Sequence, residues 1–123
     1  MILVDTSVWI DHFHKPIPAL AEALERGDVL IHPFVIGELA LGSLRDRDQV
    51  IGLLQALPGA DVADDDEVLR FIGQNSLGGT GIGYVDVHLL AATRLTADAR
   101  LWTRDKRLLV VAERLVLAVH PSH

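Results

Sequence analysis

The sequence has no cysteine, no long uninterrupted apolar run and few basic residues. The absence of cysteine excludes a disulfide framework and any thiolate zinc site. Charged residues interrupt the apolar runs well before the ~18 to 20 residues that a membrane-spanning helix needs. The N-terminal stretch MILVD also lacks the basic region that opens a secretory signal. We therefore expect a soluble, cytoplasmic protein with no membrane partner.

The chain carries 11 lysines and arginines against 17 aspartates and glutamates, which gives a formal net charge of −6. This balance argues against sequence-independent adhesion to nucleic acid through a broad basic face. It is compatible with a metal-dependent nuclease, because divalent cations held by converging acids present a positive charge to a phosphate. Half of the 123 residues are apolar, which is enough to build a core. We expect residues 1–123 to form a single domain.

Segments typical of strands and of helices alternate along the whole chain. Apolar stretches predict short strands at 2–4, 29–32, 100–103 and 116–120. Helical spacing of apolar residues and helix-end signals predict helices at 6–13, 18–27, 33–44, 47–57, 64–72, 84–97 and 106–115. Gly27 is expected to terminate the second of these helices. This alternation predicts an α/β fold in which helices cover both faces of a mostly parallel sheet.

Several helix positions carry more detailed expectations. Thr6 or Ser7 is expected to cap the first helix. In the helix predicted at 33–44, the apolar residues expected to face the core are Val35, Leu39 and Leu41. Asp64 and Glu67 have the spacing of a capping box, so the acidic cluster DDDE is interpreted as a first helical turn, with a metal patch as the alternative.

Four acidic residues stand in apolar surroundings. Asp5 and Asp105 each follow a predicted strand, and ligands of open α/β sheets bind beyond the carboxyl ends of strands. Glu38 and Asp86 lie inside the apolar helical stretches VIGELALG and GYVDVHLLAA. Burying an ionised carboxylate costs several kcal/mol unless it is paired or bound to metal. Since no lysine or arginine is similarly placed, the four acids indicate a shared cation.

Carboxylate oxygens suit hard divalent ions, so Mg²⁺ or Mn²⁺ is the expected occupant of such a site. A site of this kind supports hydrolysis of a phosphodiester by metal-activated water, with the acids as ligands or general bases. Each acid also has an ordinary structural interpretation: Asp5 and Asp86 as helix caps, Asp105 as a turn residue, and Glu38 as solvated if the helix phase shifts by one position. These alternatives stay open for each residue alone, whereas the joint occurrence of the four favours the metal site.

The order of these motifs resembles that of the PIN-domain ribonucleases, and most closely the VapC-type toxins of bacterial toxin-antitoxin pairs. The matching stretches are ILVDTSVW, VIGELALG, GIGYVDVHLLAA and LWTRDKRL, which run across nearly the whole chain in the family's order. The resemblance implies a PIN-like α/β/α sandwich with a mostly parallel sheet. It also implies cleavage of RNA with Mg²⁺ or Mn²⁺, a cognate antitoxin that covers the active site and, as in many members, a homodimer.

Carried over position by position, the resemblance implies a catalytic, metal-binding pocket formed by Asp5, Glu38, Asp86 and Asp105. It also implies supporting polar roles for Ser7, in the DTS turn, and Thr103, in TRD. The basic residues around Asp105 are candidates for contacts to RNA phosphates, with solvated helix ends as the alternative. These candidates are Arg104, Lys106 and Arg107.

Aromatic and imidazole side chains have weaker signals. Trp9 and Trp102 have rings that can stack on RNA bases, but each adjoins a predicted buried segment and is expected in the core. His88 is expected to be an ordinary packed or surface histidine. His12 and His14 are expected in a surface turn, because two histidines alone are weak evidence for a transition-metal site.

Other functional classes fit less well. A phosphatase that forms an aspartyl-phosphate needs a second Asp where this chain has Ser7, and a response-regulator receiver needs an acidic pair, a mid-chain Asp and a late Lys that the pattern does not supply. A catalytically silent PIN-fold binding module is the remaining alternative. The intact set of four acids argues against it, because a silent module has no use for buried like charges.

Overall fold

The computed structural model describes residues 1–121 and has a small parallel sheet at its centre. The strands are β1 (Ile2–Val4), β2 (Val29–Leu30) and β3 (Arg100–Trp102), in the order β2-β1-β3, and both pairs are parallel. Leu3 of β1 stands opposite Leu30 on one side and Leu101 on the other. All three leucines are buried, as expected for a parallel sheet with both faces covered.

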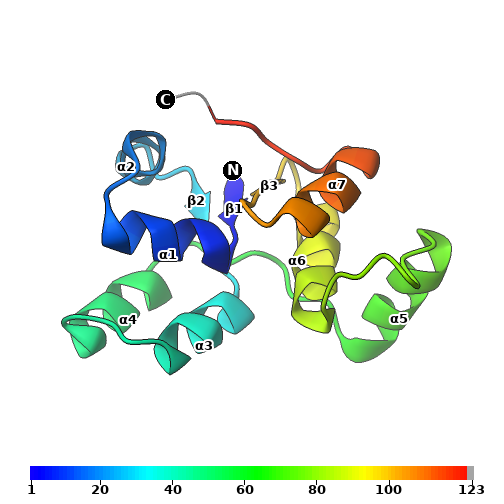
Figure 1. Ribbon diagram of the computed structural model, residues 1–123, viewed down its shortest axis with the longest axis horizontal. Helices are drawn as coiled ribbons and strands as arrows, with labels where there is room; N and C mark the ends of the chain where they lie inside the picture. Colours follow the sequence, from blue (N-terminus) through cyan, green and yellow to red (C-terminus); the bar gives the residue numbers. More distant parts are fainter. Residues whose placement is uncertain (122–123) are drawn as a thin grey trace.

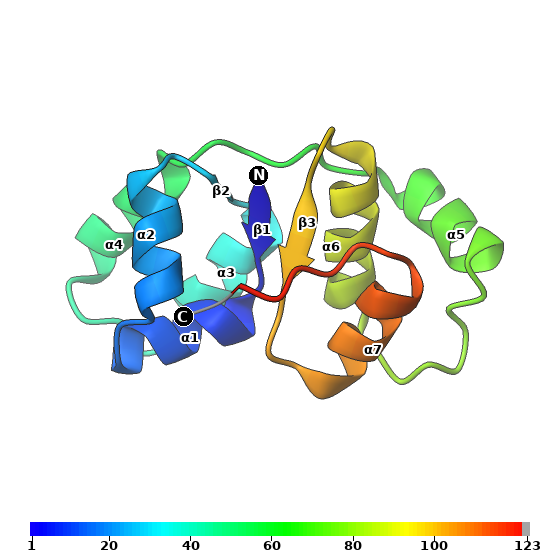
Figure 2. The same ribbon diagram turned by 90° about the horizontal axis from the view of Figure 1, so that it is seen from above.

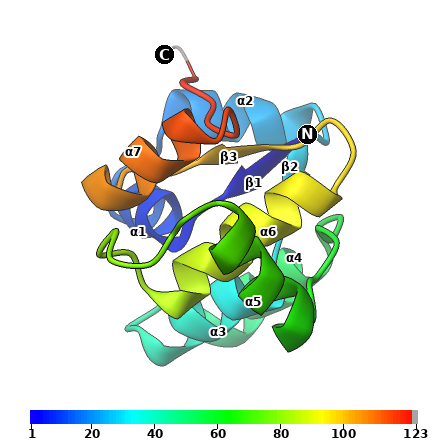
Figure 3. The same cartoon turned by 90° about the vertical axis from the view of Figure 1, so that its right-hand side faces the viewer.

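Seven helices surround this sheet in the described residues (Figure 1). They are α1 (Thr6–His14), α2 (Pro18–Glu25), α3 (Pro33–Leu41), α4 (Arg47–Gln55), α5 (Asp65–Gln74), α6 (Tyr84–Leu95) and α7 (Lys106–Arg114). Figure 3 shows α2 and α7 on one side of the strands and α3 to α6 on the other. Figure 2 shows α4 and α5 at opposite ends of the molecule. The predicted α/β fold with a parallel sheet between helical layers is confirmed.

Most helix ends follow their sequence signals. Asp64 and Glu67 form the predicted capping box, with hydrogen bonds of 2.8 and 3.0 Å between side chain and backbone, so the acidic cluster is a first helical turn. After α2, Gly27 adopts a φ of 67°, a left-handed conformation that glycine adopts without steric penalty. Among residues 1–121, no helix is long and apolar enough to cross a membrane.

Both tryptophans lie in the core, as expected. Trp9 is 3% exposed and Trp102 is 6% exposed. They pack with the fully buried side chains of the sheet and of α6, such as Leu89 and Leu90, in one apolar cluster. Stacking of RNA bases on these two rings is therefore excluded in this conformation.

The predicted strand at 116–120 is wrong. Val116 has a φ of 60°, and the Leu117 N–H donates to the Ala112 carbonyl, so these residues close the C-terminus of α7. Only an isolated bridge between Leu101 and Ala118 remains of the fourth strand.

Two predictions about helix side chains were also wrong. Leu41 is 90% exposed, because α3 ends at this residue and Gly42 follows in an extended conformation. Thr6 and Ser7 do not cap α1, since both lie inside its first turn and Asp5 occupies the cap position. Their hydroxyls bind acidic side chains instead.

Candidate active site

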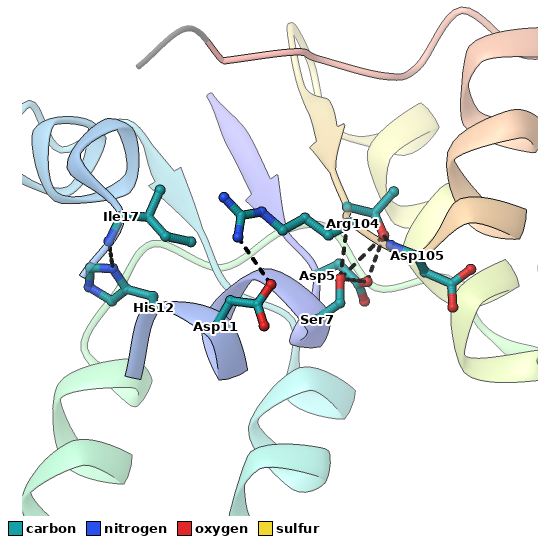
Figure 4. A network of polar contacts seen from close by, with 8 residues as sticks. Asp5, Ser7, Asp11, His12, Ile17, Arg104 and Asp105 are labelled. Carbon is teal, nitrogen blue, oxygen red and sulfur yellow. Dashed lines mark hydrogen bonds and ion pairs between the residues drawn. The ribbon is translucent and has the colours of Figure 1, made fainter. Parts of the chain in front are cut away.

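Asp5 and Asp105 lie at the carboxyl edge of the sheet, where two neighbouring strands end. β1 and β3 are parallel with Val4 opposite Trp102, and the Asp5 N–H donates to the Trp102 carbonyl at 2.9 Å. Asp5 therefore follows β1 at the same edge at which the chain leaves β3 toward Asp105 (Figure 4). This is the crevice position that parallel sheets use for ligands.

Two hydroxyl groups hold the buried Asp5 carboxylate, which is 5% exposed. Ser7 Oγ and Thr103 Oγ1 each donate to Asp5 Oδ2 at 2.7 Å. The backbone N–H of Arg104 donates to Ser7 Oγ and that of Asp105 to Thr103 Oγ1, both at 3.0 Å (Figure 4). Because each hydroxyl accepts a backbone hydrogen, its own hydrogen is directed to Asp5. Ser7 and Thr103 thus fix one oxygen of Asp5.

The other three acids are also held through one oxygen each. Thr6 Oγ1 donates to Glu38 Oε1 at 2.7 Å, the Gly83 N–H donates to Asp86 Oδ2 at 3.3 Å, and the Leu108 N–H donates to Asp105 Oδ1 at 3.0 Å. Asp105 caps α7 in this way. Asp86 therefore has the capping contact considered for it, through one oxygen, whereas Asp105 is an exposed helix cap and not the turn residue considered for it. Glu38 is exposed and not buried, since Val35 and Leu39 take the inward face of α3.

Each of the four carboxylates keeps its second oxygen without a hydrogen-bond partner among residues 1–121. These atoms are Asp5 Oδ1, Glu38 Oε2, Asp86 Oδ1 and Asp105 Oδ2. Within the same residues, none of the four carboxylates forms an ion pair with lysine, arginine or histidine. The site therefore combines four carboxylates with four oxygens available to a ligand and no paired side-chain cation.

The electrostatic coupling of the site is seen at Asp86. Partial burial raises the pKa of this carboxyl above its usual value, and the hydrogen bond from Gly83 opposes that rise. The charges of Asp5, Asp105 and Glu38 raise the pKa of Asp86 further. The other three acids thus lie within electrostatic range of Asp86.

The donor set fits a hard divalent ion. All four available atoms are carboxylate oxygens, the ligands that Mg²⁺ and Mn²⁺ prefer. In the part of the chain that the structure describes, no three His, Asp or Glu side chains are already arranged around one point as a metal shell. Mg²⁺ tolerates such spacing, because it commonly takes only one or two carboxylates and completes its shell with water and substrate phosphate.

The basic residues near Asp105 differ in their surroundings. Arg104 Nη1 forms an ion pair with Asp11 Oδ2 at 3.0 Å (Figure 4). Lys106 and Arg107 line the open hollow at the acidic site, which has a volume of about 440 Å³. The other residues of its lining are Gly81, Ile82, Asp86 and Asp105.

His88 is a packed histidine, as expected, whereas the expectation of a surface turn for His12 and His14 was wrong, because both lie in the last turn of α1. His88 is 2% exposed and lies between the rings of Phe34 and Tyr84, at centroid distances of 4.6 and 4.7 Å. His12 Nδ1 accepts a hydrogen bond from the Ile17 N–H at 2.9 Å, which fixes the turn after α1 (Figure 4). His14 is exposed at the end of that helix.

Thr6 is the site residue that sequence reasoning missed. It was expected only as a helix cap, whereas its hydroxyl holds Glu38 across 32 positions of the chain. The available signal was its place directly after Asp5, where the first turn of α1 faces the other acids.

Comparison with known proteins assigns the class. The family model of the PIN domain matches residues 2–114, and the chain belongs to this family. Among curated proteins, Ribonuclease VapC32 of two Mycobacterium tuberculosis strains is 52% identical over 108 residues, which cover 88% of this chain and 87% of the relative.

Two solved structures share the fold. One is FitAB bound to an IR36 DNA fragment, with a TM-score of 0.62, 17% identity, and coverage of 100% of this chain and 99% of that one. The other is FitAcB from Neisseria gonorrhoeae, with a TM-score of 0.59, 20% identity, and coverage of 92% and 94%. At these identities the likeness concerns the fold alone.

Proposed function

We propose that this protein is an endoribonuclease that hydrolyses RNA phosphodiester bonds with Mg²⁺ or Mn²⁺, and that it is the toxin of a toxin-antitoxin pair. The observation that carries the proposal is the set of four carboxylates, each with one oxygen held by the chain and one available. The relative named Ribonuclease VapC32, at 52% identity, supports the same activity. A silent binding module does not account for four neighbouring carboxylates that are kept without a paired side-chain cation.

In this proposal, the catalytic, metal-binding residues are Asp5, Glu38, Asp86 and Asp105. A bound divalent cation would supply Lewis-acid stabilisation of the negative charge on the phosphate. Ser7 and Thr103 orient Asp5, and Thr6 orients Glu38, which leaves the second oxygen of each acid available to a ligand. Such pre-orientation lowers the cost of assembling the site when substrate binds.

Lys106 and Arg107 are proposed as contacts to RNA phosphates, because both side chains border the acidic hollow. Arg104 also lies at the site but must first release Asp11, with which it is paired. Single-stranded RNA is the proposed substrate class, since its phosphates and unpaired bases are accessible to an open site.

The proposed antitoxin contact is an apolar groove between α1, α3 and α4, with a volume of about 550 Å³. Ile10, Phe13 and Leu44 contribute apolar side chains, and Glu38 also lines the groove. An antitoxin segment bound there would lie next to the acidic site and so block access to it. The capacity of the groove for an apolar segment supports a protein partner.

We further propose that residues 1–123 form one PIN domain, that the protein acts in the cytoplasm and that it forms a homodimer. The single apolar cluster supports one domain. Exposed apolar side chains outside the groove, including Leu69 and Val116, offer surface for self-association. Analytical ultracentrifugation tests the dimer directly.

The deciding experiment measures cleavage of a panel of structured RNAs with Mg²⁺, with Mn²⁺ and with chelator. We expect cleavage that requires the metal and is lost in Asp5→Asn, because this variant removes the charge while its size stays the same. Asp66→Asn, in the exposed first turn of α5, is the charge-matched control and should keep full activity. Metal-independent cleavage, or full activity of Asp5→Asn, would contradict the proposal.

A further inference from the structure

A second hollow lies beside the acidic site along α7, and we refer to it as the α7 groove. Its volume is about 420 Å³, and its lining consists of Thr80, Lys106, Arg107, Val110, Val111 and Arg114. Lys106 and Arg107 also line the acidic hollow together with Asp86 and Asp105. The two hollows are therefore adjacent, and these two basic side chains form the border between them.

The α7 groove is basic although the protein as a whole is acidic. Three of the 11 basic residues of the chain line it, and no aspartate or glutamate does. Within residues 1–121, Lys106, Arg107 and Arg114 form no ion pair, whereas Arg26 and Arg104 are each paired with an aspartate. Arg114 Nη2 donates to the Asn75 carbonyl at 2.8 Å, which holds its guanidinium without neutralising it. The groove thus carries three positive charges without a carboxylate partner.

The Arg107 side chain lies against the glycine-rich segment before α6. Gly81 has a φ of 82°, and a Cβ atom at this position would lie 3.2 Å from Arg107 Nη1 and 3.5 Å from its Cδ. The Arg107 side chain therefore lies directly over the backbone of Gly81, where a larger residue would displace it. Because Arg107 and Arg114 are seven residues apart, they lie about 10 Å apart along one side of α7.

Resting on the proposed function, we propose that the α7 groove binds two backbone phosphates of the RNA strand next to the cleaved one, with Arg107 as the ligand of one and Arg114 as the ligand of the other. The groove continues the acidic site, and its charge complements the RNA backbone. Val110 and Val111 supply an apolar floor for the sugar between the phosphates. The substrate strand thus leaves the acidic site across Lys106 and Arg107 and follows α7.

The test measures RNA binding and not cleavage, so that it is independent of the catalytic step. Fluorescence anisotropy gives the affinity of the full chain carrying Asp5→Asn for a labelled single-stranded RNA at several salt concentrations. The plot of log affinity against log salt concentration has a negative slope. Each lost phosphate contact makes this slope shallower by ~0.7 for a single strand. We expect this shallower slope for Arg107→Gln and for Arg114→Gln. Arg70→Gln, an exposed arginine on α5, is the matched control and should leave the slope unchanged.

Gly81→Ala provides a second variant that keeps every charge, because its Cβ atom requires Arg107 to shift by only a few tenths of an ångström. We expect it to change the salt slope much less than Arg107→Gln does. Thermal melting first shows that each variant is folded. If Gly81→Ala does not fold, Arg107→Gln and Arg114→Gln decide the question.

The two proposals fail in different ways. Salt slopes equal to that of the Arg70→Gln control, in a protein whose wild type cleaves RNA, would overturn the α7 groove as a phosphate site. If the wild type does not cleave RNA, or if its cleavage does not depend on Asp5, the proposed function would instead be overturned. The slopes are measured without cleavage, so the first result does not depend on the second.

Discussion

At the scale of single residues, the site depends on two hydroxyl groups whose orientation is set by hydrogen bonds from backbone N–H groups. Ser7 and Thr103 accept from the N–H groups of Arg104 and Asp105, which leaves their own hydrogens for Asp5. Asp5 is therefore held by one hydroxyl from α1, that of Ser7, and by one from the residue after β3, that of Thr103. Outer-shell contacts of this kind typically change metal affinity or activity by about 10- to 100-fold when removed.

Replacing Thr103 tests this arrangement. Thr103→Val retains the shape of the side chain but removes the hydroxyl that donates to Asp5 Oδ2 and accepts from the Asp105 N–H. We expect RNA cleavage to fall about 10- to 100-fold. Thr103→Ser keeps the hydroxyl and should retain most of the activity. Equal rates for the two variants, measured under single-turnover conditions, would show that the hydroxyl does not orient Asp5.

At the scale of secondary-structure elements, local patterns predicted most of the fold. Apolar strands, Gly27 and the Asp64–Glu67 capping box depend on neighbouring residues, and these predictions were confirmed. The failures depend on geometry that the sequence does not display. Val116 closes α7 in a left-handed conformation that is uncommon for a β-branched residue, so the strand signal after it was misleading.

The candidate site shows the same division. Its four acids were predicted from their positions next to strands and within helices, and the supporting roles of Ser7 and Thr103 were implied by the family resemblance. The contacts that hold Glu38 and that join Thr103 to Asp5 were not predictable, because these partners are far apart in the chain. Thr6 and Glu38 are 32 positions apart, and Thr103 and Asp5 are 98 apart. The pairing of Arg104 with Asp11, at a separation of 93, was missed for this reason as well.

A buried histidine, His32, lies where the start of α3 meets α6, and its pKa differs between the folded and unfolded chain. His32 Nδ1 accepts from the Phe34 N–H and caps α3, and its ring lies 6.4 Å from that of His88. Burial, and then the nearby His88, lower the pKa of His32 from 6.5 to about 4. The folded protein thus holds His32 neutral, while the unfolded chain binds a proton below about pH 6.5.

His32 should therefore make the protein less stable in acid. Its contribution to the free energy of unfolding is fully present above the unfolded pKa and is lost as the pH falls from 6.5 through about 4. The loss is at most about 3 kcal/mol. His32→Asn keeps an acceptor for the cap but does not titrate, so urea unfolding at about pH 7 and about pH 4.5 should show a smaller decrease for this variant than for the wild type. Parallel decreases would argue against a neutral His32 in the folded state.

At the scale of the whole molecule, charges are separated between two adjacent hollows. Although the chain has a net charge of −6, Asp86 and Asp105 line one hollow, whereas no aspartate or glutamate lines the next. Lys106 and Arg107 border both hollows, and Arg114 lines only the second. The raised pKa of Asp86 shows that the acidic side opposes ionisation in the metal-free protein, through burial and then through the charges of the other three acids. In the proposed function, a bound cation would relieve this repulsion, which would link metal binding to folding stability.

This linkage predicts that Asp86→Asn stabilises the metal-free protein but weakens the stabilisation that added Mg²⁺ provides. Asp86→Asn keeps an acceptor for the Gly83 N–H and removes one of the repelling charges, so the metal-free variant should melt at a higher temperature than the wild type. Added Mg²⁺ should stabilise the wild type by about 2.7 kcal/mol at 100 times its dissociation constant, and stabilise Asp86→Asn much less. Calorimetry at constant ionic strength, with Asp66→Asn as the control that responds like the wild type, measures both effects. Equal Mg²⁺-dependent shifts for Asp86→Asn and the wild type would remove Asp86 from the proposed metal site, because a ligand of the ion cannot lose its charge without weakening the ion's binding.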